Sequence, residues 1–161
     1  MERFGSIQSE ELMASAMAGL ETGVLAALGM LAYHMLGSIV GGVGIWEHLE
    51  RLSAAVFGRQ IYQASQALAA SSGAALLVFW GGAMGAAFAL GSRGKWAAQR
   101  LFLLGPLAAL LWYYLAYEVW LPRFGRGAYW VAPRRTLVLG HLIFGLLLSL
   151  YPRVLRRLRA G

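Results

Sequence analysis

The chain contains 161 residues, of which 59% are hydrophobic and only 13% are charged. Soluble domains carry about 25% charged residues, so half of the usual charge is missing. Cysteine is absent, which excludes disulfides, iron–sulfur clusters and thiol catalysis. The 14 basic residues outnumber the seven acidic ones, but they gather in short segments beside apolar stretches. Lipid head groups explain such segments, and without aromatic side chains interleaved for base stacking we expect no nucleic-acid partner.

Four stretches are nearly free of charge, and each approaches or exceeds the roughly 17–25 apolar residues that a membrane-spanning helix needs. They cover residues 12–38, 64–92, 101–121 and 136–152. A soluble bundle would show a polar face along every helix, and these stretches show none. The sequence therefore predicts an all-α fold, an integral membrane four-helix bundle forming a single transmembrane domain over 1–161. The predicted helices cover about 11–38, 64–91, 98–121 and 135–157.

The first predicted helix begins after Ser9, whose hydroxyl is a favourable N-cap, with Glu10 and Glu11 near the positive end of the helix dipole. The N-terminus lacks the basic segment of a cleavable signal, so we expect this helix to remain in the mature protein. The glycines of "GSIVGGVG", residues 37–44, predict its end.

An interfacial amphipathic helix is predicted over about 45–60, between the first two spanning helices. The charged residues and His48 lie away from an apolar side whose members recur at helical spacing: Trp46, Leu49, Leu52 and Val56. A tryptophan at the start of such a helix is a typical membrane-interface anchor.

Small residues recur every four positions in the first two spanning helices. The first set is Ser15, Gly19, Gly23 and Ala27, and the second is Ala69, Gly73, Gly81, Gly85 and Ala89. Small residues at this spacing let helix backbones approach closely. We expect them to pack helices within one chain, with a dimer interface as the alternative.

The predicted orientation follows from the basic residues between the helices. Residues 1–10, 91–100 and 153–161 hold eight Lys and Arg, whereas residues 39–63 and 121–135 hold six. The positive-inside rule then places both termini in the cytoplasm. Thirteen arginines against one lysine are typical of a GC-rich bacterial genome, so we expect a multi-pass protein of the bacterial cytoplasmic (inner) membrane.

Four ionisable residues fall inside the predicted spans, where each needs a physical reason. With alternating helix directions, His34, Glu118 and His141 lie toward the same membrane face, whereas Glu21 lies in the opposite half of the first helix. His48 of the amphipathic segment belongs to the first face as well.

This convergence supports several interpretations. His34 and His141, on different helices at similar depth, fit the axial ligands of a b-type haem. The same two histidines with Glu118 fit a divalent-metal site, although no H-x-x-x-H or E-x-x-H pair occurs within a helix. Glu118 and the neighbouring tyrosines also fit a proton or ion path. The simplest alternative is structural: each imidazole donates to a backbone carbonyl of a neighbouring helix.

The segments "YYLAYEVWLP" at 113–122 and Gly140-His141-Leu142-Ile143-Phe144-Gly145 in the last helix complete a pattern that begins with the small-residue-rich first helix. The pattern resembles a broad group of uncharacterised small four-helix bacterial inner-membrane proteins, over about 130 residues. The resemblance implies a fold and no activity. The long Arg-rich third loop departs from the shorter loop expected for that group.

No phosphate-binding loop or nucleophile constellation is evident in the sequence. We therefore predict a structural or accessory membrane protein without intrinsic catalysis, partnered by the lipid bilayer and by other membrane subunits of a larger complex. The alternatives are a haem- or metal-binding redox subunit that uses His34 and His141, and a small transporter or ion-conducting oligomer.

Overall fold

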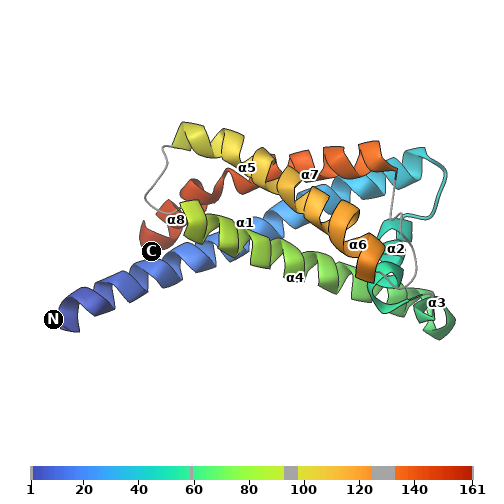
Figure 1. Ribbon diagram of the computed structural model, residues 1–161, viewed down its shortest axis with the longest axis horizontal. Coiled ribbons are helices and arrows are strands. Elements are labelled where there is room, and N and C mark those ends of the chain that lie inside the picture. Colours follow the sequence, from blue (N-terminus) through green and yellow to red (C-terminus); the bar gives the residue numbers. More distant parts are fainter. Residues whose placement is uncertain (1, 59, 93–97, 125–132, 161) are drawn as a thin grey trace.

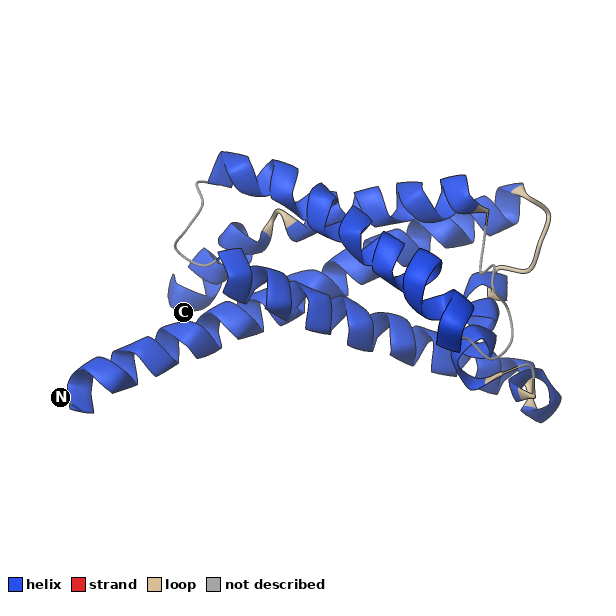
Figure 2. Cartoon of the chain, viewed as in Figure 1, coloured by secondary structure: helices blue, strands red, loops and turns tan. Residues whose placement is uncertain are grey.

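The computed structural model describes residues 2–58, 60–92, 98–124 and 133–160. Within these residues every regular element is a helix (Figures 1 and 2). Four helices are long and apolar enough to cross a membrane: Ser9–Val40, Gln66–Ser92, Gln99–Phe124 and Arg134–Ala160. The predicted fold class is confirmed. The centres of the predicted loops, at 93–97 and 125–132, lie outside the described residues.

Helix α1 (Glu2–Val40) is the longest element. At 1.5 Å per residue its 39 residues measure about 58 Å, roughly twice the thickness of the hydrocarbon core. Its N-terminal part extends beyond the other helices (Figure 1). The predicted start near residue 11 is wrong, because no proline interrupts residues 2–10 and the helix continues through the expected cap.

Helix α1 packs along α4 (Gln66–Ser92) through the two predicted small-residue stripes. A Cβ atom added to Gly85 would lie 2.6 Å from the Cα of Gly23, and one added to Gly19 would lie 2.5 Å from the Cβ of Ala89. The two backbones are therefore in direct contact. Both stripes are occupied within one chain, as the sequence predicted.

The third span is longer and less regular than the predicted helix 98–121. It consists of α5 (Ala98–Tyr113), the π-helical segment η1 (Tyr114–Trp120) and the single turn α6 (Leu121–Phe124). A π-helical insertion widens the helix, and such insertions are frequent at functional sites. Segment η1 forms one wall of the cavity described below.

The fourth span consists of two helices, α7 (Arg134–Leu148) and α8 (Tyr151–Ala160). The prediction of one continuous helix over 135–157 is wrong, because a turn at Ser149 and Leu150 separates them. Pro152 is the physical reason: it has no N–H to donate to the carbonyl oxygen of Leu148, so the helical hydrogen-bond pattern is interrupted there. Helix α8 packs against α1, where Arg157 forms an ion pair with Glu21.

The predicted amphipathic segment forms α2 (Glu47–Phe57), followed by the single turn α3 (Ile61–Ala64). Helix α2 packs on α4 at Gly73, where an added Cβ atom would lie 2.9 Å from the Cα of Leu49. Both chain termini lie at one end of the bundle, and α2 lies at the other (Figure 1). His34, His48 and His141 line a cavity at the α2 end.

Candidate functional site

A cavity of about 590 Å³ lies at the α2 end of the bundle. Helix α1 packs against α4 and α7, and α7 packs against α5, whereas α4 and α5 make little contact with each other. The space between them is lined mainly by apolar and aromatic side chains, which include Met30, Phe79, Trp80, Met84, Trp112, Tyr117, Trp120 and Phe144. Its volume is within the range of small-molecule sites.

All three histidines of the chain line this cavity. His34 comes from α1, His48 from α2 and His141 from α7, and each is at most 5% exposed. The rings of His34 and His48 stack in parallel, with centroids 3.8 Å apart and an interplanar angle of 8°. The sequence placed these residues toward one face of the membrane, and the structure brings them together.

The sequence did not reveal that His48 is buried. It was grouped with the polar side of the amphipathic segment, yet it lines the cavity together with Leu52 and Val56. These three positions are spaced by four residues, so they share one face of α2. That spacing was the available signal, but only the packing of α2 across the bundle end shows which face is covered.

His48 is held in its neutral form. Burial lowers its pKa to about 3, and the charges of His34, His141 and Arg51 act in the same direction. Its Nδ1 atom is buried and has no hydrogen-bond partner among the described residues. A buried polar atom of this kind is rare in folded proteins and calls for a physical reason, such as a ligand or water.

His141 has a defined tautomer. Its Nδ1 lies 2.8 Å from the carbonyl oxygen of Leu137, one turn earlier on the same helix. A carbonyl only accepts, so the Nδ1–H donates and Nε2 carries the lone pair. The rings of Tyr113 and Tyr117 lie edge-on to the imidazole, at centroid distances of 5.4 and 5.7 Å. His141 therefore offers an acceptor on the ring edge away from α7.

Gly140, which precedes His141, makes room for His34. A Cβ atom at Gly140 would lie 2.6 Å from Nε2 and 3.1 Å from Cε1 of His34. Gly145, at the other end of the same motif, packs against α5, since its added Cβ would lie 2.5 Å from the Cα of Pro106. Both glycines of the "GHLIFG" motif thus serve close helix contacts.

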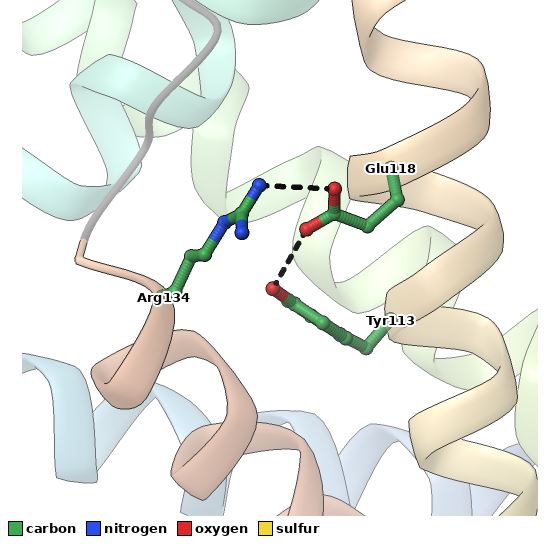
Figure 3. A network of polar contacts seen from close by, with 3 residues as sticks. All are labelled: Tyr113, Glu118 and Arg134. Carbon is green, nitrogen blue, oxygen red and sulfur yellow. Dashed lines mark hydrogen bonds and ion pairs between the residues drawn. The ribbon is translucent and has the colours of Figure 1, made fainter.

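Glu118 does not line the cavity with the histidines. Its carboxylate accepts hydrogen bonds from the hydroxyl of Tyr113 at 3.3 Å and from Arg134 at 3.2 Å (Figure 3). The Arg134 contact is an ion pair that ties the start of α7 to η1. Tyr113 contacts both His141 and Glu118, so the predicted residues are neighbours without forming one set of ligands.

A three-residue metal site is not formed among the described residues. Two stacked imidazoles direct their lone pairs into parallel planes and not toward a common point, and Nε2 of His34 is packed against Gly140. This geometry does not suit joint ligation of one metal ion by His34 and His48. Haem or metal binding by His34 and His141, with or without Glu118, stays a prediction.

Comparison of the chain with protein-family models, with curated protein sequences and with solved structures gave no match.

Proposed function

We propose that this protein is a ligand-binding component of a membrane, without intrinsic catalysis, that holds a small molecule in the histidine-lined cavity. One observation carries the proposal: three buried histidines from three helices meet at one cavity of about 590 Å³ in an otherwise apolar bundle. Ligand sites commonly combine an apolar lining with a few convergent polar groups.

The structural alternative, interhelical hydrogen bonding, accounts poorly for the same residues. The hydrogen bond of His141 goes to a carbonyl of its own helix, and Nδ1 of His48 has no partner among the described residues. Neither imidazole nitrogen therefore links two helices. Burying imidazoles without such bonds is unfavourable. An apolar interior is also normally packed without large voids. A ligand that fills the cavity and hydrogen-bonds to the free imidazole nitrogens would supply both the missing packing contacts and the missing hydrogen bonds.

The accessory role and the location are part of the same proposal. The excess of Arg and Lys near the termini supports a cytoplasmic position for both ends in a bacterial inner membrane. A cavity without an evident nucleophile supports binding over catalysis, and it suits a subunit that stores or presents a molecule to other membrane proteins.

Extraction of the purified protein tests the proposal. Ala116 lines the cavity from η1, whereas Leu107 of α5 faces outward and does not line it. We expect an organic extract of the wild type, analysed by mass spectrometry, to contain a compound in near-stoichiometric amount. Ala116→Phe should lose the compound and Leu107→Phe should keep it. An extract without any compound that depends on the cavity would contradict ligand binding. A Soret band in the absorption spectrum would identify the compound as haem, the predicted alternative.

A further inference from the structure

We propose that the ligand of this cavity is a lipid-soluble ring of the quinol class, which enters from the bilayer between α4 and η1 and donates a ring hydroxyl to Nε2 of His141. This inference rests on the ligand-binding function proposed above and names its chemical class.

The route of entry follows from residues that line the cavity and are also exposed. Phe79 and Trp80 of α4 and Leu115 and Trp120 of η1 line the cavity, and each is 43–64% exposed. They lie within two of the four candidate membrane spans. The wall between α4 and η1 therefore opens sideways, toward lipid, and a molecule dissolved in the bilayer reaches the cavity directly.

The lining excludes charged ligands. The described residues around the cavity include no Asp, Glu, Lys or Arg. Their polar groups are the three imidazoles, the hydroxyl of Tyr117 and the indole N–H groups of Trp80, Trp112 and Trp120. A phosphate or carboxylate placed there would be desolvated without a counter-charge, which is strongly unfavourable. The ligand is therefore neutral and carries few polar atoms.

The aromatic side chains favour a flat ring. Trp80 of α4 and Trp112 of α5 contact each other in the lining, with ring centroids 5.6 Å apart and an interplanar angle of 36°. Phe144 of α7 and Tyr117 of η1 add two more rings to the lining. Aromatic rings prefer offset-stacked or edge-on contact with one another, which an aromatic ligand provides and an acyl chain does not.

The tautomer of His141 sets the polarity of the hydrogen bond. Because Nδ1–H is committed to the carbonyl of Leu137, Nε2 can only accept. A quinol hydroxyl can donate a hydrogen bond to this nitrogen. The carbonyl oxygen of the oxidised quinone is itself an acceptor, so it cannot form a hydrogen bond with Nε2. One hydrogen bond of this kind corresponds to a preference of roughly 3–10-fold for the reduced form.

Titration in phosphatidylcholine nanodiscs tests the inference. The probes are a short-chain ubiquinol kept reduced under anaerobic conditions, the corresponding ubiquinone, and the dimethyl ether of the quinol. Quenching of tryptophan fluorescence reports binding, since Trp80, Trp112 and Trp120 line the cavity. We expect the quinol to bind roughly 3–10-fold more tightly than the quinone. The dimethyl ether, which keeps the ring and lacks the O–H donors, should bind no better than the quinone.

Variants separate the hydrogen bond from the cavity. His141→Phe should bring the quinol and quinone affinities together, Ala116→Phe should abolish binding of both, and Leu107→Phe should behave as the wild type. Equal affinities of the wild type for quinol and quinone would overturn the inference, and so would a dimethyl ether that binds as tightly as the quinol. The ether comparison uses the wild-type protein, so it does not depend on whether a variant folds. If extraction yields a different cavity-dependent compound and the quinol does not bind, the class is wrong while ligand binding stands. If extraction and titration both fail, both proposals fall.

Discussion

Replacing Gly140 with alanine tests the position of His34 directly. The new methyl carbon would lie 2.6 Å from Nε2 of His34 and 3.3 Å from Cγ of Met30, whereas ordinary van der Waals contact begins near 3.4 Å. The imidazole would have to retreat by about 0.8 Å. The imidazole borders the cavity and can shift, but the shift disturbs its stacking on His48, whose ring centroid lies 3.8 Å away.

The expected loss of stability can be bounded from this geometry. Overpacking a well-packed site by one methyl group typically costs about 1–3 kcal/mol. Alanine also gains about 1 kcal/mol over glycine in helix propensity, which partly hides the clash. Gly37→Ala in α1 is the matched control, since a Cβ atom there meets nothing within 4 Å. The difference between the two variants should therefore be about 1–3 kcal/mol, or roughly 2–10 °C in Tm for a chain of this size.

Thermal unfolding in detergent, followed by intrinsic tryptophan fluorescence, measures the difference between the two variants. A double-mutant cycle then assigns the cause: in a His34→Ala background, Gly140→Ala should cost no more than Gly37→Ala. If Gly140→Ala is tolerated as well as the control, or if its cost persists without the imidazole, then His34 does not lie against α7 and the histidine cluster is wrongly placed.

Three further outcomes follow from the packing and electrostatics. Gly85→Leu should destabilise the bundle by about 3 kcal/mol, because its side chain would meet the backbone of α1, and a Tm equal to that of the wild type would exclude this contact. Acidification from pH 7 to 5 should loosen α2: the pKa of His48 is about 3 when docked and near 6.5 in water, so docking is most stable above pH 6.5 and weakens by about 2 kcal/mol at pH 5. Amide hydrogen exchange in α2 should then rise roughly 25-fold. A His48→Phe variant with the same pH dependence would instead assign the effect to His34 or His141. Glu118→Gln should lower stability by less than about 1 kcal/mol, because its ion pair with Arg134 is partly exposed, and a matching loss in Arg134→Gln with no additive effect in the double variant would confirm the pairing.

The four spans, and the use of the small-residue stripes for packing within the chain, were predicted from the sequence alone. Lipid offers no hydrogen bonds to a backbone, so a long apolar stretch has one available structure, the helix. Small residues every four positions predicted close helix packing within one chain, and the structure pairs the Gly23 stripe with the Gly85 stripe. The helix boundaries were predicted less accurately, because Pro152 breaks the last helix within an apolar stretch that hydropathy treats as continuous.

The existence of the cavity, and the grouping of the three histidines around it, were decided only by the tertiary structure. The depths of His34 and His141 followed from counting residues, but depth does not say which way a side chain points around its helix. The burial of His48 depends on α2 crossing the end of the bundle, and the pairing of Glu118 depends on where α7 begins. Periodicity fixes which residues share a face, whereas the identity of the neighbour on that face is set by contacts between segments far apart in the chain.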